Sequence, residues 1–405
     1  MDIKKPLTGL KVVDLSINIA APGAGKILAD QGADVIKVEA LVGDPYRPQS
    51  AAACCSVAEN ENPIYDIENA NKRHISLDLK SEKGIEIFYK LIENTDILIT
   101  NFRDAALQAL GLTYEELSPK YPRLVYGHLI GYGEKGPDTN RPGYDLICYW
   151  ARTGLMLDSV AEGQVPLINI GGLGDHPTAV ALAQGVTAAL VRQMKIGKGD
   201  KVTVSLFHSG IWAAASLFSI GQFHNWYPVQ YNKPTVTPVV HPYKCADGVW
   251  VMIMLFDYEK KWASFCKTLG RPDLVEDQRF KTFLDARTNQ SALVDILVEI
   301  IGSKPYIEWA DKWQAEDIPF EKLRHIMDLL EDETAKANNF IRPVTYPSGR
   351  TVYLPTPPIQ FKEMGLSEFK TTTGIGSETE EILLQMGYTA TAIDEMKANN
   401  IIREK

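Results

Sequence analysis

The 405-residue sequence has few cysteines, no block of basic residues and no long apolar run, and each absence excludes a class of protein. Its five cysteines are odd in number and lack CxxC spacing, which indicates reduced thiols and excludes a disulfide framework or a cysteine zinc site. The net charge is −9 and the basic residues are scattered, so neither nucleic acid nor an anionic membrane is expected as a partner.

The apolar segments are too short to span a membrane. The longest, GIWAAASLFSIGQF at residues 210–223, is interrupted by polar residues and falls short of the roughly 20 residues that a spanning helix needs. The N-terminal MDIKKPLTGLKVVDLS has no apolar stretch after its basic residues, so no signal peptide is expected. Together with the reduced thiols, these features predict a cytoplasmic protein.

Hydrophobic residues make up 45% of the chain and charged residues 23%, as in a globular protein, and the length favours two domains. Strand patterns alternate with amphipathic helix patterns through the first half, which predicts a doubly wound α/β domain with a mainly parallel sheet. The predicted strands cover residues 10–16, 33–40, 75–79, 96–101 and 123–133, and a tight turn followed by another strand covers 197–207. Predicted helices cover residues 22–32 and 81–95.

Changes in composition predict the domain boundaries. Residues 1–224 form the N-terminal part of the large domain, and the Pro-, Tyr- and Asn-rich residues 225–242 form a linker. Residues 243–330, which include the strand pattern VWVMIMLF at residues 249–256, form a smaller α/β domain. Residues 331–405 comprise a second, Pro-rich linker and a return to the large domain that ends in the amphipathic helix 377–388.

Two familiar motifs are incomplete. GAGK at residues 23–26 would need Ser or Thr at the position of Ile27 to form a phosphate-binding Walker loop. Leu28 occupies the third glycine position of a dinucleotide loop, so these glycines are expected to allow close packing of a helix on the sheet. The seven histidines show no HExxH spacing, and no metal site is expected.

The stretch GGLGDHPTAV, residues 171–180, is more informative because three glycines precede Asp175 and a predicted helix that reaches about Lys195. One interpretation is structural, since Asp is a favoured N-cap residue worth about 1 kcal/mol. The other is catalytic. The glycines let a ligand approach the backbone, and the small-residue helix gives rigid support. The helix N-terminus keeps the carboxylate ionised and supplies amides for an oxyanion, as a carboxylate nucleophile requires.

The motifs of the chain, taken in order, resemble those of the class III CoA-transferases, also called the CaiB/BaiF or formyl-CoA transferase family. The extended blocks YDIENANKR, GYGEKGPD and LGDH are most similar to the clostridial 2-hydroxyacyl-CoA transferases of amino-acid fermentation. The resemblance runs nearly end to end through LTGLKVVDLS, AAPGAGKILADQGADVIKVE, GDPYR, NANKRHISLDLKSEKG, DILITNFR, RPGYDL, GLGD, GKGDKVTVSLFHSG, DQRF and GSETEEILLQMGY.

This resemblance implies an enzyme that moves CoA from an (E)-2-enoyl-CoA to an (R)-2-hydroxy acid without a metal or a tightly bound cofactor. Asp175 in GLGD matches the nucleophile of the family, which forms an acyl anhydride and then a CoA thioester. Isocaprenoyl-CoA and 2-hydroxyisocaproate are the expected substrates in leucine degradation, with cinnamoyl-CoA and phenyllactate as the alternative pair. The family further implies a homodimer of two interlocked, ring-like subunits.

The resemblance also implies which residues of this chain bind the cofactor. Leu77 and Phe102 could equally be core residues, and Lys80 could equally be a solvated residue at the start of a helix. The residues that match segments contacting CoA in the family are Ala20, Leu77, Lys80, Asn101, Phe102, Arg103 and Tyr144.

Three positions depart from the family pattern. Ala40 stands where an arginine often follows the second strand, and Ala109 replaces a basic residue for which Arg103 is a substitute. Ile19 replaces the glutamine that formyl-CoA transferases place beside the acyl group, and the glycine-run loop of those enzymes is absent from the predicted small domain. The last two departures favour a less polar acyl site than a formyl or oxalyl group would require.

Two other functions fit less well. A 2-methylacyl-CoA racemase needs two acid–base groups at the substrate α-carbon, and the histidine that racemases carry in a GHD segment is Tyr144 here. A non-catalytic CoA-binding protein would not require the intact GLGD segment. Exchange of CoA between an enoyl-CoA and a free 2-hydroxy acid distinguishes all three functions.

Overall fold

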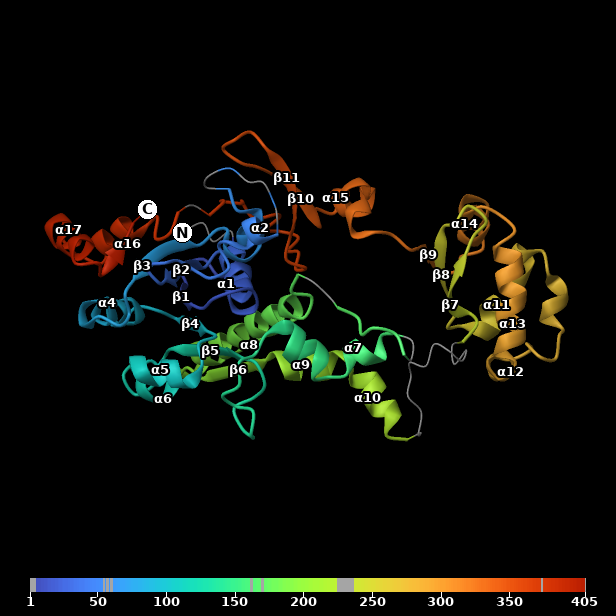
Figure 1. Ribbon diagram of the computed structural model, residues 1–405, viewed down its shortest axis with the longest axis horizontal. Helices are drawn as coiled ribbons and strands as arrows, with labels where there is room; N and C mark the ends of the chain where they lie inside the picture. The colour runs from blue at the N-terminus through green and yellow to red at the C-terminus, as the bar shows by residue number, and fades with distance from the viewer. Residues whose placement is uncertain are drawn as a thin grey trace. The chain divides into compact units, whose positions relative to one another are not determined.

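The computed structural model describes residues 5–53, 55, 58, 61–160, 163–168, 171–223, 237–372 and 374–404. The chain forms two compact units (Figure 1). Residues 225–236 of the predicted linker lie outside the described residues. Unit 1 comprises Met1–Met156, Ile168–Phe218 and Asp332–Lys405, and unit 2 comprises Leu157–Leu167 and Ser219–Glu331.

Unit 1 is built on a seven-stranded sheet with the order β12-β3-β2-β1-β4-β5-β6. Each pair of neighbours is parallel except β12 and β3, which are antiparallel. The mixed α/β fold with a mainly parallel sheet is therefore confirmed. The strands are β1 (Lys11–Leu15), β2 (Asp34–Glu39), β3 (Arg73–Leu77), β4 (Ile97–Thr100), β5 (Val125–Ile130), β6 (Lys201–Ser205) and β12 (Ile402–Arg403).

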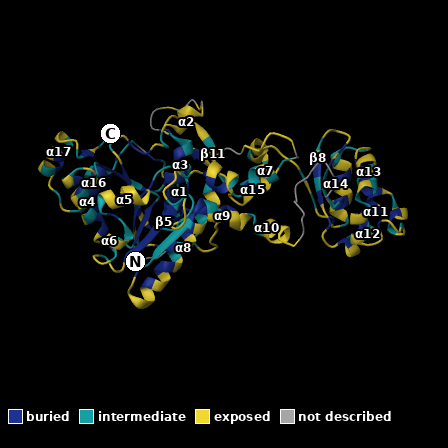
Figure 2. Ribbon diagram, turned by 60° about the horizontal axis from the view of Figure 1, so that its bottom comes forward, coloured by how far each residue is buried: buried dark blue, intermediate teal, exposed yellow. Residues whose placement is uncertain are grey.

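Both faces of this sheet are covered by apolar side chains. Successive residues of a strand point to opposite faces, and in this sheet they belong to two different hydrophobic cores. In β4, Ile97 and Ile99 belong to one core and Leu98 to the other. The helices carry their exposed residues on their outer sides (Figure 2). The first core includes α1 (Ala20–Asp30) and α8 (Asp175–Ile196), and the second includes α4 (Glu82–Ile92), α5 (Asp104–Leu110), α6 (Tyr114–Leu117), α16 (Thr379–Gln385) and α17 (Ala390–Ala398).

The glycines of GAGK serve two kinds of packing within α1. A Cβ atom at Gly25 would lie 2.9 Å from Asp14 Oδ2 of β1, so this glycine does allow helix–sheet contact. A Cβ atom at Gly23 would lie 2.6 Å from Oε2 of Glu68, which belongs to α3 (Pro63–Asn69). Gly23 therefore makes room for a buried carboxylate of another helix, which the sequence did not indicate.

The C-terminal segment returns to unit 1 in two ways. The predicted helix at residues 377–388 is α16, and Thr379 Oγ1 accepts a hydrogen bond of 3.1 Å from the backbone N–H of Ser76 in β3. The Pro-rich segment predicted as a linker instead contains a hairpin of β10 (Ile341–Thr345) and β11 (Thr351–Pro355). Its alternating side chains suit a two-stranded ribbon, where proline is tolerated at an edge.

Unit 2 has an antiparallel sheet of β7 (Val240–Lys244), β8 (Trp250–Met254) and β9 (Phe320–Lys322). The strand predicted at residues 249–256 is β8. The large aromatic side chains of Trp262, Trp309 and Trp313 are buried in its core. The helices around this sheet are α11 (Tyr258–Leu269), α12 (Phe283–Thr288), α13 (Gln290–Ile301) and α14 (Tyr306–Ala315).

Among the described residues, no helix has both the length and the apolar character to cross a membrane. Within the same residues, no group of three or more His, Cys, Asp and Glu side chains is arranged to hold a metal ion.

The remaining helices are short. They are α2 (Gln49–Ala52), α7 (Leu155–Asp158), α9 (Leu206–Ala213), α10 (Ala215–Gly221), α15 (Glu333–Ala337), a π-helix (Leu146–Ala151) and two 3₁₀ helices (Pro272–Val275 and Ile326–Glu331).

Candidate active site

Asp175 is the first residue of α8, and the N-cap position belongs to Gly174. The N-cap interpretation of Asp175 is therefore wrong by one residue. The helix behind it packs as expected, because one face of small and aliphatic residues from Thr178 to Leu190 is buried. Asp175 is half-buried at the end of this rigid support.

The three glycines before Asp175 are required by the backbone and by its neighbours. Gly171 and Gly172 have positive φ angles of 84° and 73°, which favour glycine. A Cβ atom at Gly174 would lie 2.2 Å from Asp145 Oδ1 and 2.4 Å from Cγ of Tyr149. The loop thus presses Gly174 against a neighbouring carboxylate and brings Asp145 close to the start of α8.

Two further carboxylates surround Asp175. Asp145 is 8% exposed and Glu68 is 2% exposed. Burial, followed by the charges of Asp145 and Glu68, raises the pKa of Asp175 to about 7, although His176 acts in the opposite direction. The expectation that the helix N-terminus keeps this carboxylate ionised is therefore wrong below neutral pH. The helix dipole is worth only about 0.3–1 kcal/mol at such a position, and desolvation with two like charges outweighs it.

His176 is held by the buried Glu68. Its Nε2 atom lies 2.8 Å from Glu68 Oε1. The hydrogen bond to Glu68 raises the pKa of His176, and the charges of Glu68, Asp175 and Asp145 act in the same direction. This favours an imidazolium beside Asp175. Since the His176 side chain is 46% exposed, it remains accessible to a ligand.

Asp175 lines a small cavity of about 100 Å³ at the carboxyl ends of β1, β4 and β5. The chain leaves β1 toward β2 and β3 on one side and continues through β4, β5 and β6 on the other. A change of direction of this kind is the usual place for a ligand in an open α/β sheet. The predicted residues that line the same cavity are Ala20, Asn101, Phe102, Arg103 and Tyr144.

The remaining predicted residues, Leu77 and Lys80, line a larger cavity of about 1040 Å³. Phe102 lines both cavities, so they are adjacent. Ala40 and Ala109, the two positions without the basic residue of the family pattern, also line the larger cavity. The structure thus brings all the predicted positions to one connected region of unit 1.

The predicted residues differ in what their side chains already do. The Asn101 side chain accepts a 3.0 Å hydrogen bond from the Ile17 N–H and donates a 2.7 Å bond to the Ile17 carbonyl, so it positions the loop before α1. Leu77 is 1% exposed and belongs to the core, whereas Tyr144 is 62% exposed. Lys80 and Arg103 are exposed cations at the two cavities.

Ile19 forms an apolar wall next to the Asp175 carboxylate. A Cβ atom at Gly172 would lie 3.0 Å from Ile19 Cδ1 and 3.3 Å from Asp175 Oδ2. The isoleucine and the carboxylate therefore face the same small space. An apolar group joined to Asp175 would meet a hydrocarbon surface there, in agreement with the less polar acyl site expected from this substitution.

Sequence reasoning missed Asp145, Glu68 and His176. Asp145 and His176 each follow a residue that was singled out, so their positions in the chain were a usable signal. Glu68 and His176 are separated by 108 residues, and their pairing depends on the fold. Gly23 leaves room for Glu68, but the glycine alone does not indicate which side chain lies against it.

Comparison with known proteins identifies the class to which this fold and site belong. Residues 7–370 match the family model of CoA-transferase family III. The chain belongs to this family, and it is an enzyme of the CoA-transferase type.

Particular relatives are similar over almost the whole chain. The (R)-2-hydroxy-4-methylpentanoate CoA-transferase of Clostridioides difficile is 38% identical, with 98% of this chain and 99% of the relative covered. The cinnamoyl-CoA:phenyllactate CoA-transferase of Clostridium sporogenes is 39% identical, with coverage of 98% and 97%. The crystal structure of Rv3272 from M. tuberculosis has a TM-score of 0.79 at 27% identity and covers 93% of this chain and 98% of its own.

Proposed function

We propose that the protein transfers CoA from a 2-enoyl-CoA to an (R)-2-hydroxy acid, with Asp175 as the nucleophile. One observation carries the proposal. Asp175 lines a small cavity that meets, at Phe102, a cavity large enough for a cofactor. The relatives at 38% and 39% identity are named for transfer involving 2-hydroxy acids and, in one case, an enoyl-CoA, which supports the substrate class.

In the proposed reaction, the Asp175 carboxylate attacks the thioester carbonyl of the donor. The C–S bond breaks, which gives an acyl–aspartyl anhydride and CoA thiolate. The thiolate attacks the aspartyl carbonyl, releases the donor acid and leaves an aspartyl-CoA thioester. The acceptor carboxylate then attacks this thioester, the C–S bond breaks with release of CoA thiolate, and a second anhydride forms between the acceptor and Asp175. Finally the thiolate attacks the acceptor carbonyl, releases the acceptor as its CoA thioester and regenerates Asp175. One thioester is exchanged for another, so no external energy source is needed.

We assign CoA binding to the residues around the two cavities. The nucleotide end of CoA lies in the larger cavity against Leu77 and Lys80, and the pantetheine arm passes Phe102 toward Asp175. Lys80 and Arg103 are the cations assigned to phosphate groups, since ammonium and guanidinium groups donate charge-assisted hydrogen bonds to phosphate. The backbone at Ala20 and the exposed ring of Tyr144 complete the contacts near the thioester. No metal takes part in this scheme.

Among acceptors, we favour 2-hydroxyisocaproate, which is 2-hydroxy-4-methylpentanoate, with isocaprenoyl-CoA as the donor. The apolar side chain of Ile19 beside the Asp175 carboxylate supports a hydrocarbon acyl group. Phenyllactate with cinnamoyl-CoA is the second candidate pair, because the relative that uses it is equally similar. Both pairs suit the fermentation of amino acids, leucine in the favoured case, in the cytoplasm. A homodimer, interlocked as the family resemblance implies, is the proposed assembly.

The proposal is tested by following CoA exchange between each enoyl-CoA and each 2-hydroxy acid with wild-type protein, Asp175→Ala and Asp175→Asn. We expect both variants to fold and to lose transfer. As a control, Asp200→Asn changes a half-exposed aspartate of the same unit and should remain active. Near wild-type turnover by Asp175→Ala would contradict the assignment of the nucleophile.

A second experiment detects the covalent intermediate. An anhydride and a thioester are activated carboxyl groups, so hydroxylamine should convert the Asp175 side chain to a hydroxamate when acyl-CoA is present. Peptide mass spectrometry over residues 171–192 locates the modification. A resting carboxylate does not react, so no change is expected without acyl-CoA. Active turnover without any acyl-CoA-dependent mass change at Asp175 would exclude the covalent mechanism.

A further inference from the structure

A second, apolar cavity of about 390 Å³ lies one helical turn from the Asp175 site. Ala20 lines the Asp175 cavity and Gly23 lines the apolar one, three residues further along α1. On α8, Asp175 lines the former and Ala179 the latter. The residues that line the apolar cavity are Gly23, Lys26, Ile27, Ile67, Glu68, His176, Pro177, Ala179, Val180, Pro355, Thr356, Pro357 and Pro358.

The sizes of the cavities limit where an acyl group on Asp175 can extend. The Asp175 cavity holds about 100 Å³, below the range of about 300–1,000 Å³ that is usual for small-molecule sites. In the proposed function the larger cavity of about 1040 Å³ is taken by CoA itself. A branched or aromatic side chain therefore needs separate space, and the apolar cavity has a suitable volume.

The apolar cavity has one polar end close to Asp175. There the His176 imidazole, held 2.8 Å from Glu68 Oε1, is accessible and follows Asp175 directly in the chain. A cation at this place suits the carboxyl end of a substrate. Apart from Lys26 and Thr356, the rest of the wall is apolar and includes Ile27, Ile67, Val180 and prolines, which suits a hydrocarbon side chain.

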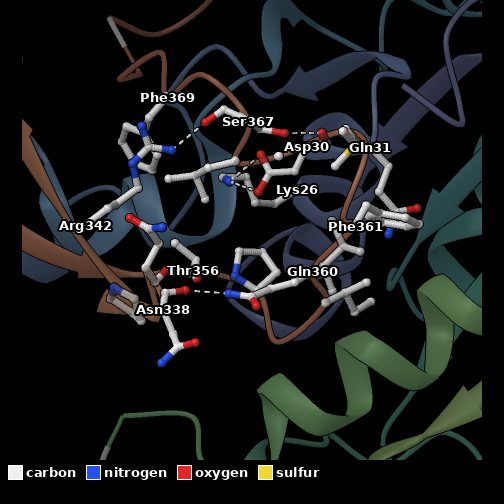
Figure 3. Close-up of a pocket in the computed structure, with 18 of the residues that line it drawn as sticks. Lys26, Asp30, Gln31, Asn338, Arg342, Thr356, Gln360, Phe361, Ser367 and Phe369 are labelled. Atoms are coloured by element: carbon white, nitrogen blue, oxygen red, sulfur yellow. Dashed lines mark hydrogen bonds and ion pairs between the residues drawn. The ribbon is translucent and has the colours of Figure 1, made fainter. Parts of the chain in front are cut away.

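A neighbouring cavity of about 470 Å³ has a more polar wall (Figure 3). It shares Lys26, Ile27, Pro355, Thr356 and Pro357 with the apolar cavity. Lys26 Nζ donates hydrogen bonds of 2.6 and 2.5 Å to the two carboxylate oxygens of Asp30. Arg342 donates a 2.6 Å bond to the Ser367 carbonyl. The wall of this neighbouring cavity thus carries charged groups, including a buried Arg342 Nε without a hydrogen-bond partner among the described residues, which makes it a poorer site for an apolar group.

We propose that the apolar cavity receives the hydrocarbon side chain of the acyl group carried by Asp175, with the His176–Glu68 pair contacting its carboxyl end. The ligand class is a 2-hydroxy acid, or the corresponding 2-enoyl group, with a branched or aromatic side chain. The inference rests on the proposed function and adds the residues that select the substrate. Val180 is the key residue, because it lies in the cavity wall on the same helix as Asp175.

The test compares acceptors of different size in wild-type protein and Val180→Trp. We expect kcat/KM to fall at least about tenfold for 2-hydroxy-4-methylpentanoate and phenyllactate and less than about twofold for 2-hydroxypropanoate, since each lost methylene contact is worth at least about tenfold. In a ping-pong reaction this constant reports only the half-reaction that the acceptor enters. Val191→Trp, at a 47% exposed position of α8 outside the cavity, is the matched control.

Val180→Ala supplies an opposite change if the tryptophan variant fails to fold. It enlarges the cavity, and the ratio of kcat/KM for phenyllactate to that for 2-hydroxy-4-methylpentanoate should rise. An unchanged ratio in Val180→Ala, or an unchanged size preference in a folded Val180→Trp, would overturn the inference. Absence of CoA exchange in the wild-type protein with every pair would instead contradict the proposed function, so the two failures are distinguishable.

Discussion

The raised pKa of Asp175 predicts a specific pH dependence of the reaction. Attack on a thioester needs the carboxylate, and burial together with the charges of Asp145 and Glu68 raises the pKa of Asp175 to about 7. The ionised form is present above this value and is lost as the pH falls through it. In the free enzyme, kcat/KM for acyl-CoA should therefore fall about tenfold per pH unit below 7.

Removal of a neighbouring charge should move this acidic limb. The charged groups that act on Asp175 are Asp145 and Glu68, which raise its pKa, and His176, which lowers it. In addition to burial, the charge of Asp175 in turn raises the pKa of Tyr46. Asp145→Asn keeps the size of the side chain and removes one like charge, so the limb should shift to lower pH. His176→Gln removes the opposing charge and should shift it to higher pH.

The assay is the rate of CoA exchange at limiting acyl-CoA between pH 5.5 and 8.5, with Asp200→Asn as a control for a distant carboxylate. An unshifted aspartate with a pKa of about 3.9 would give a flat profile over this range. A flat wild-type profile would refute the electrostatic reasoning, and so would an acidic limb that stays in place in Asp145→Asn.

Three further predictions concern packing and stability. Gly174→Ala places a Cβ atom 2.2 Å from Asp145 Oδ1 and should lower kcat/KM about 100-fold by displacing Asp175, whereas Gly221→Ala, in open space, should not. Lys72→Met breaks the fully buried 2.7 Å ion pair with Asp14. It should lower the free energy of unfolding, measured with urea, by about 3–5 kcal/mol. Lys83→Met, which breaks an exposed ion pair, is the control and should lower it by about 0–1 kcal/mol. Asp175→Asn should raise the melting temperature of the protein, and the increase should be larger at pH 8 than at pH 5. The reason is that the pKa of Asp175 is raised in the folded state, so ionisation of Asp175 lowers the stability of the wild-type protein as the pH rises toward 7. An equal increase at both pH values would contradict this.

The parts of the fold that were predictable from the sequence are those set by local patterns. Apolar runs of β-branched residues gave β1, β2 and β4 to β6, and the small-residue helix that begins at Asp175 was found at its observed start. The hairpin of β10 and β11 was missed because its prolines resemble those of a linker. The two-residue strand β12 was missed because only its pairing with β3 defines it.

The candidate site was partly predictable for the same reason. The positions matched by resemblance lie around two adjacent cavities because they follow strands whose carboxyl ends meet at one edge of the sheet. Glu68 was not predictable, since it belongs to α3 and its carboxylate lies against Gly23 of α1. Its contact with His176 joins two segments of the chain that share no local pattern.

The charge state of Asp175 shows how a sound local rule gives the wrong sign when tertiary neighbours are unknown. A helix N-terminus does favour a carboxylate, but its field is worth about 1 kcal/mol or less and acts over a single turn. Burial and two further acids act more strongly and reverse the direction. The same neighbours supply His176 with its partner, so the imidazolium and the carboxylate lie side by side. In the proposed reaction the imidazolium suits the step in which the acceptor carboxylate approaches the aspartyl-CoA thioester, because a cation there attracts the incoming carboxylate.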